Sequence, residues 1–208
     1  MSSIAAAHWA NYSGETVKRL IDIAASALGL ACLAPLLVLV SIAIKMESQG
    51  AVFSLQACRG RHGRTFYLFQ FRTSCLSHKK SCSSASETDQ ATTHLGAALR
   101  MSGIERIPRL FNVLRGEMSI VGPRPRALSE TSSDPVSILG RVKPGIVGWA
   151  QANGYKASEP TITEMKEAYE LDRWYIDHQS LSLDLLVIWR TLKGLFEKHD
   201  SLQHSGSC

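Results

Sequence analysis

IAASALGLACLAPLLVLVSIAI, residues 23–44, is a run of 22 residues without a formal charge. A helix needs about 20 predominantly apolar residues to cross a bilayer. Lys18 and Arg19 precede the run and Lys45 follows it, so the positive-inside bias does not choose an orientation. The small-residue cleavage site of a removed signal peptide is missing after the run. The sequence therefore predicts a membrane anchor over residues 17–46.

Pro35 lies near the middle of this run and removes a backbone hydrogen bond, which bends or breaks a helix. Three interpretations are open. The helix is broken at Ala34-Pro35 and re-enters on one membrane face, or it is a kinked helix that spans the bilayer, or it is a buried core helix. Asp22 begins the run and is expected at the membrane interface, or paired with Lys18 or Arg19, because a submerged carboxylate is costly.

Composition and charge limit the class of protein. The length of 208 residues suits one domain with an anchor. The formal net charge of +5 favours an anionic partner such as a phosphate-bearing substrate, an acidic lipid surface or nucleic acid. Nucleic acid is not expected, because the chain has no recognition motif or aromatic-rich basic patch. The five irregularly spaced cysteines favour a reduced, cytosol-facing domain over a disulfide framework.

Residues 47–196, after the anchor, combine short β patterns with amphipathic helical patterns. Residues 1–16 and 197–208 are expected to be terminal tails. Residues 52–56 and 65–71 predict two strands of a β-hairpin, joined by a glycine-punctuated basic turn. The fold class is therefore α+β: a membrane-inserted helix followed by a small cytosolic domain.

Two capping-box patterns predict helices in this domain. One helix runs to Arg115 and starts at Ser102 or nearer Ile107, and the other runs from Thr161 to about Asp177. The apolar segment 183–196 either lies on a membrane surface or covers the core. Residues 74–93 predict a loop. Its candidate zinc ligands, Cys75, His78 and Cys82, are one short of the usual four, so zinc is not expected.

Asp172 lies on the apolar stripe of the helix that ends near Asp177, together with Tyr169 and Tyr175. A carboxylate that faces a core must be paired, coordinated or catalytic, because its desolvation is costly. An ion pair with an arginine is the structural alternative. Segment 100–126 contains six arginines against two glutamates and is the most basic stretch of the chain.

Taken together, these stretches resemble the bacterial sugar transferase family, the monotopic phosphoglycosyltransferases that start exopolysaccharide, O-antigen and glycoprotein glycan synthesis. The resemblance covers about residues 17–195, and its most specific part is the run from Asn112 to Pro125 followed by Lys143-Pro144-Gly145. The matching motifs are Lys18-Arg19 with Asp22, Ala34-Pro35, Phe71-Arg72-Thr73, residues 110–125, Val142-Lys143-Pro144-Gly145-Ile146 and Glu170-Leu171-Asp172.

The resemblance implies an activity, partners and a location. Such enzymes transfer a sugar phosphate from a UDP-sugar to polyprenyl (undecaprenyl) phosphate and release UMP. A helix broken at the proline holds the domain on the cytoplasmic face of the bacterial inner membrane, so the resemblance favours the re-entrant interpretation of Pro35. Inner-membrane lipids and other polysaccharide-assembly proteins are further expected partners. The motifs do not select the sugar.

The resemblance also implies site residues. Arg124 matches the family's phosphate-binding arginine, Asp172 matches an active-site carboxylate, and the other candidates for the substrate phosphates are Arg72, Arg126 and Lys143. The family uses an Asp-Glu pair, in which the Asp attacks the diphosphate and the Glu helps to hold Mg²⁺. Aligned without gaps back from Pro125, this pair falls on Glu105-Arg106.

The altered pair leaves two hypotheses. Position 105 keeps a carboxylate, one methylene longer, but the arginine at 106 cannot bind Mg²⁺ as a carboxylate does. In the first hypothesis Glu105 forms an acyl-phosphate intermediate and Arg106 replaces part of the metal's charge. In the second the chain is a catalytically impaired homologue, a membrane-bound regulatory or interaction partner in exopolysaccharide production. Mg²⁺ is the cofactor implied by the resemblance, with no ligand assigned.

Overall fold

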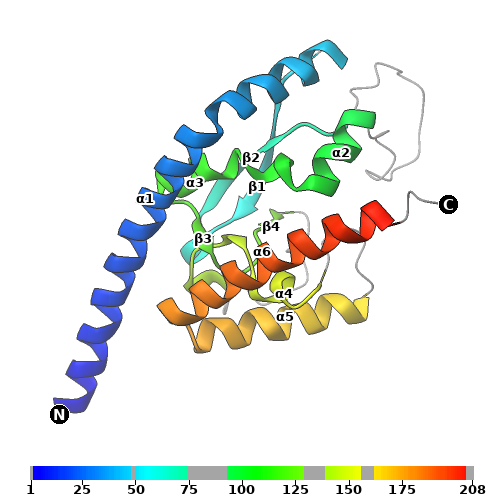
Figure 1. Cartoon of the computed structure of the whole chain (residues 1–208). Helices are drawn as coiled ribbons and strands as arrows, with labels where there is room; N and C mark the ends of the chain where they lie inside the picture. Colours follow the sequence, from blue (N-terminus) through cyan, green and yellow to red (C-terminus); the bar gives the residue numbers. More distant parts are fainter. Residues whose placement is uncertain (1, 48–49, 75–92, 129–138, 156–161, 205–208) are drawn as a thin grey trace, which may run out of the picture.

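The computed structural model describes residues 2–47, 50–74, 93–128, 139–155 and 162–204. A long N-terminal helix lies along one side of a mixed domain, and the last two helices cover the other side (Figure 1). This arrangement confirms the α+β fold class. The elements are α1 (Ser2–Glu47), β1 (Phe53–Arg59), β2 (Thr65–Phe71), α2 (His94–Ser102), α3 (Arg109–Arg115), β3 (Ser119–Val121), β4 (Arg126–Ala127), β5 (Gly145–Val147), α4 (Trp149–Ala152), α5 (Ile162–Asp177) and α6 (Leu181–His204).

Two small sheets form the centre of the domain. The first has the order β2-β1-β4 and is antiparallel, with Phe53 opposite Phe71 and Arg59 opposite both Thr65 and Arg126. The predicted hairpin is therefore confirmed. The second sheet pairs β3 with β5 in parallel. These strands are three residues each, too short to give a sequence pattern of their own.

Helix α1 passes through Pro35 without interruption, so the predicted break at Ala34-Pro35 is wrong at the level of secondary structure. A proline removes one hydrogen bond, and the helix resumes when the turns on both sides are intact. The helix bends partway along its length (Figure 1). It also begins at Ser2, so the segment expected as an N-terminal tail is helical. The re-entrant topology stays a prediction.

Large apolar side chains cover the outer face of α1. Residues 15–47 are long and apolar enough to cross a membrane, and only 11% of the most apolar 18-residue window is buried. The interpretation as a buried core helix is therefore wrong, and the exposed face indicates membrane association. The exposed side chains are Val17, Leu20, Ile21, Ile23, Leu28, Val38, Leu39, Ile42 and Met46.

Asp22 is buried inside the protein, and its predicted pairing with Lys18 or Arg19 is wrong, because Lys18 pairs with Asp184 and Arg19 donates to the Val113 carbonyl. Its position at a membrane interface stays a prediction. Its carboxylate accepts hydrogen bonds from the Ser119 hydroxyl at 2.8 Å and the Ile120 amide at 3.1 Å, which offset its desolvation. Lys18, one helical turn earlier, lies 2.8 Å from the Asp184 carboxylate and donates to the Tyr175 hydroxyl at 3.0 Å. These buried contacts fix α1 to β3, α5 and α6.

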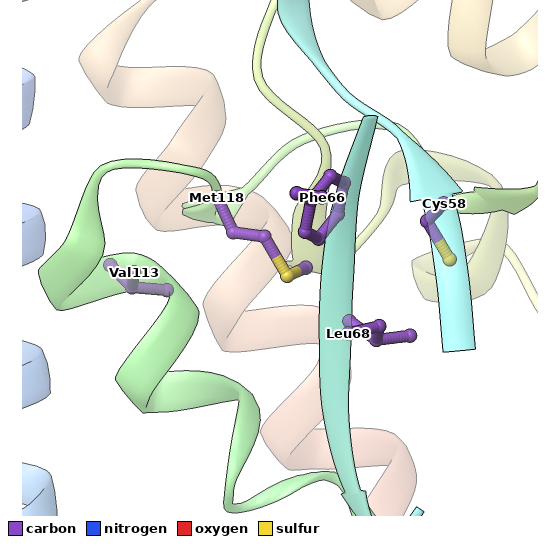
Figure 2. Close-up of a cluster of buried hydrophobic side chains, with 5 residues drawn as sticks. All are labelled: Cys58, Phe66, Leu68, Val113 and Met118. Atoms are coloured by element: carbon purple, nitrogen blue, oxygen red, sulfur yellow. The ribbon is translucent and has the colours of Figure 1, made fainter. Parts of the chain in front are cut away.

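The hydrophobic core between the hairpin and α3 contains Cys58, Phe66, Leu68, Val113 and Met118. Figure 2 shows Met118 reaching toward the two β2 side chains. Cys58 is buried in this core. This core holds α3 against β2, next to the segment that carries Glu105.

Several helix ends differ from the sequence predictions. Ser102 ends α2 instead of capping α3, and its hydroxyl donates to the Ala98 carbonyl. Helix α3 begins at Arg109, near the later of the two predicted starts, and ends at Gly116 with a φ of 86°. Helix α5 ends at Asp177 as predicted, and α6 continues past residue 196. Thr161, Cys75, His78 and Cys82 lie outside the described residues.

Gly145 lets β5 approach the end of β3 so closely that any side chain would collide with backbone. A Cβ there would lie 2.1 Å from the Gly122 nitrogen and 2.6 Å from its oxygen. Gly145→Ala is expected to lower the free energy of unfolding by about 1–3 kcal/mol, as overpacking does.

Gly194→Ala is the matched control for this prediction. Gly194 lies within α6 and a Cβ there would meet nothing within 4 Å, so alanine is expected to raise the free energy of unfolding by about 0.5–1 kcal/mol. Denaturant unfolding of both variants in detergent checks the opposite signs. Equal effects at the two positions would contradict the close approach of β3 and β5.

Candidate active site

Glu105 lies on a tight turn between α2 and α3. Gly103, with a φ of 74°, ends α2 and starts the single 3₁₀ turn Ile104–Arg106. The Glu105 side chain is 16% exposed, and its two carboxylate oxygens lie 3.7 Å from the Arg100 Nε and 3.8 Å from the Arg106 Nε. The carboxylate is therefore positioned between two guanidinium groups and remains accessible.

Arg109 and Asn112 attach α3 to β2 beside this turn. The fully buried Asn112 accepts a hydrogen bond from the Phe69 amide at 3.0 Å and donates to the Tyr67 carbonyl at 2.7 Å. The Arg109 Nη2 donates to the Gln70 Oε1 at 3.1 Å. These contacts fix the first turn of α3, and with it the position of Glu105.

Arg109 is a buried cation with a lowered pKa. Burial, and then the neighbouring Arg106 guanidinium, lower the pKa of Arg109 to about 10. The charge of Glu105 raises this pKa and that of Arg124 lowers it further. The four side chains therefore interact electrostatically, although 19 residues separate Glu105 from Arg124 in the sequence.

Asp172 lies in the interior, as its place on the apolar stripe of α5 predicts. It is 7% exposed, and its oxygens lie 3.4 Å from the Arg124 amide nitrogen and 3.5 Å from that of Ala150. Burial raises the pKa of Asp172 to about 6, and the two amides partly oppose this shift. The carboxylate thus contacts the loop that carries Arg124 and the start of α4.

Close backbone packing holds the Arg124 loop. The Gly145 amide donates to the Pro123 carbonyl at 2.9 Å. A Cβ on Gly148 would lie 3.7 Å from the Asp172 Oδ1 and 3.8 Å from the Arg124 nitrogen. The β3–β5 pair and α5 together therefore place Arg124 next to Asp172.

The other predicted phosphate ligands lie in different places. Arg126 stacks over the Tyr169 ring at 5.3 Å, and its charge, like that of Arg124, acts on Asp172. Arg72 is buried after β2. Burial, and then the charge of Arg19 of α1, lower the pKa of Lys143. The phosphate-binding roles of these residues stay predictions.

Sequence reasoning missed Arg109 as a site residue. The family resemblance points to the altered pair at residues 105 and 106. In the sequence, Arg109 is only one of the six arginines of the basic segment 100–126. The available signal was spacing: Arg109 follows Arg106 by three residues, which places the two on one side of a helical turn.

The pair offers a divalent cation one carboxylate instead of two, which makes it a poorer donor set than the family's Asp-Glu pair. Mg²⁺ is usually bound by one or two carboxylates together with water and substrate phosphates. Among the described residues, no group of three or more His, Cys, Asp or Glu side chains is arranged to hold a metal. Glu105 supplies the one carboxylate of the pair, and it lies next to the Arg100 and Arg106 guanidiniums.

The raised pKa of Asp172 predicts a pH dependence of stability. Because the folded-state pKa of about 6 exceeds the ordinary value of 3.8, the folded chain binds more protons between these values, and stability rises as the pH falls through them. Compared with Asp172→Asn, the native protein is expected to gain about 2–3 kcal/mol in free energy of unfolding from pH 7 to pH 4.

Asp177→Asn, at an exposed position of the same helix, is the control for this measurement. Denaturant titrations at several pH values give the differences between the native protein and each variant. A difference for Asp172→Asn that is as flat as the one for Asp177→Asn would show that the Asp172 carboxylate is not desolvated.

Comparison with known proteins identifies the family of the chain. Residues 13–198 match the family described as bacterial sugar transferase. The chain is 41% identical to an undecaprenyl-phosphate glucose phosphotransferase of Komagataeibacter xylinus, over 85% of the chain and 35% of that protein.

Two further relatives are named UDP-glucose:undecaprenyl-phosphate glucose-1-phosphate transferase. The Xanthomonas campestris protein is 39% identical over 82% of the chain and 37% of its own length, and the Caulobacter vibrioides protein is 36% identical over 86% and 69%. The chain thus spans little more than a third of the first two relatives and about two thirds of the third. With nearly its whole length matched, the chain belongs to the bacterial sugar transferase family.

Proposed function

We propose that this protein transfers a sugar phosphate from a UDP-sugar to polyprenyl phosphate, the first membrane step of exopolysaccharide biosynthesis. The observation that carries the proposal is the Glu105 carboxylate, which lies between the Arg100 and Arg106 guanidiniums. The motif resemblance aligns this residue with the nucleophile of the family. Phosphoryl transfer needs an in-line nucleophile and positive groups that stabilise the negative charge on the phosphates. The Glu105 carboxylate and the two guanidiniums beside it are groups of these two kinds, which supports the proposal.

The proposed chemistry has two steps. A Glu105 oxygen attacks the phosphorus that carries the sugar, the bond between this phosphorus and the bridging oxygen breaks, and UMP leaves with that oxygen. The product is an acyl phosphate that still carries the sugar. An oxygen of polyprenyl phosphate then attacks the same phosphorus, which releases the Glu105 carboxylate and forms a polyprenyl diphosphate sugar. Arg124 and its neighbours would hold the phosphates in line.

Undecaprenyl phosphate and UDP-glucose are the first substrates to test. The relatives from Komagataeibacter, Xanthomonas and Caulobacter are named for undecaprenyl phosphate and glucose. The polyprenyl chain requires a site at a membrane surface. The exposed apolar face of α1 and the side chains Leu181, Leu185, Trp189 and Leu192 of α6 support such a location.

Lipid-dependent release of UMP tests the proposed function. The purified, folded chain is expected to release UMP from UDP-glucose, and to form a lipid-linked sugar, only when undecaprenyl phosphate is present. Omitting the lipid is the control, and a panel of other UDP-sugars defines the specificity. If no UDP-sugar yields UMP or a labelled lipid, the proposal fails and the catalytically impaired homologue becomes the better hypothesis.

We further propose that the domain lies on the cytoplasmic face of the inner membrane, with α1 re-entering on that face. Epitope tags at the two ends of the chain are then both expected to be cleaved by protease from the cytoplasmic side only. The bend in α1 and its exposed apolar face support this topology (Figure 1). Accessibility of the two tags from opposite sides would show a spanning helix instead.

A further inference from the structure

Two buried guanidinium atoms of the site lack hydrogen-bond partners. Within the described part of the chain, the Nε atoms of Arg106 and Arg109 are the buried side-chain nitrogen or oxygen atoms without one. The Arg106 Nε forms an ion pair with the Glu105 carboxylate, but their separation of 3.8 Å is too long for a hydrogen bond. A buried polar atom without a partner is costly, and charged groups cost more than neutral ones. Since such atoms are rare in native proteins, each requires an explanation, and a bound ligand is one.

The surroundings indicate that the missing partner is an anion. Arg109 is 9% exposed; burial first, and then the charges of Arg106 and Arg124, lower its pKa, while the charge of Glu105 raises it. Arg100 adds a further positive charge beside Glu105. Guanidinium groups favour phosphate oxygens because their donors match the spacing of those oxygens.

We propose that Arg106 and Arg109, together with Arg124, form a diphosphate-binding site that works without a divalent cation. In this site the guanidinium at position 106 occupies the place where the family's pair has its metal-binding carboxylate. The inference rests on the proposed function for its natural ligand, the diphosphate of a nucleotide sugar. It explains both the unpartnered Nε atoms and the poor fit of the donor set to Mg²⁺.

Binding of inorganic pyrophosphate and of UDP to the purified full chain tests this inference by calorimetry. Affinity in EDTA is expected to equal or exceed affinity in Mg²⁺, and UMP, with one phosphate, is expected to bind more weakly than UDP. Arg106→Gln removes one charged contact and is expected to weaken pyrophosphate binding by about tenfold to a hundredfold. Arg109→Gln is expected to have an effect of the same size.

Arg115→Gln is the matched control, because it removes one charge from the same helix at a residue that stacks on Phe69. It is expected to bind pyrophosphate like the native chain. Thermal unfolding shows whether Arg109→Gln folds. If it does not, the half-buried Arg106 decides the result, since its side chain is 33% exposed and its replacement is tolerated more easily.

Two results would overturn the inference: pyrophosphate binding that disappears in EDTA, or an Arg106→Gln variant that binds as tightly as Arg115→Gln. Failure of the proposed function would give a different set of results from failure of this inference. In that case pyrophosphate binds in EDTA and depends on Arg106, but no UDP-sugar yields UMP in the presence of polyprenyl phosphate.

Discussion

Glu105→Gln is expected to abolish both the covalent phosphosugar intermediate and the lipid-dependent release of UMP. The amide has almost the shape of the carboxylate but is not a nucleophile, so the acyl phosphate cannot form. Loss of a catalytic nucleophile typically lowers turnover by about 10⁴-fold or more. Labelling with a UDP-sugar that carries ³²P in the phosphate next to the sugar, followed by denaturing electrophoresis, detects the intermediate directly.

Glu167→Gln provides the control for this substitution. Glu167 lies on the exposed side of α5 and accepts a hydrogen bond from the Tyr155 hydroxyl at 2.7 Å, which the oxygen of glutamine can also accept. Its labelling and turnover are expected to match those of the native chain. Labelling that persists in Glu105→Gln would assign the nucleophile to another residue and would remove the basis of the proposed chemistry.

Local patterns were sufficient to predict much of the fold. The strands of the hairpin and the end of α5 at Asp177 follow from residue type and spacing over a few positions. The inward position of Asp172 follows from helical periodicity, because one polar residue on an apolar stripe must enter the core. None of these features depends on a distant segment of the chain.

Features set by distant contacts could not be predicted. Asp22 was expected to pair with a neighbouring basic residue, but its hydrogen-bond partner Ser119 is 97 residues away. The parallel pair of three-residue strands that holds Arg124 has no pattern in the sequence. Arg109 resembles any arginine of a basic segment until it is buried and bonded to Gln70 of β2. In each case the position of a chemical group depends on which segments pack together.

The double variant Glu105→Asp/Arg106→Glu is expected to convert the site into one that depends on Mg²⁺. It restores the family's Asp-Glu pair, with a shorter nucleophile and an added carboxylate that can ligate the cation. If the native glutamate holds its oxygen about 1 Å from the best position, turnover is expected to rise by about a hundredfold when Mg²⁺ is supplied. In EDTA the variant is expected to bind pyrophosphate more weakly than the native chain, because a guanidinium has been replaced by a negative charge.

Rates of UMP release across a Mg²⁺ titration separate the possible causes of this change. The native chain is expected to give a flat profile and the double variant a rising one, while Arg106→Gln stays flat at a lower rate because it has neither the guanidinium nor the second carboxylate. If the double variant gives the same rate and the same flat profile as the native chain, positions 105 and 106 are not the family's pair. The nucleophile would then have to be sought at Asp172, the other carboxylate that the fold places next to Arg124.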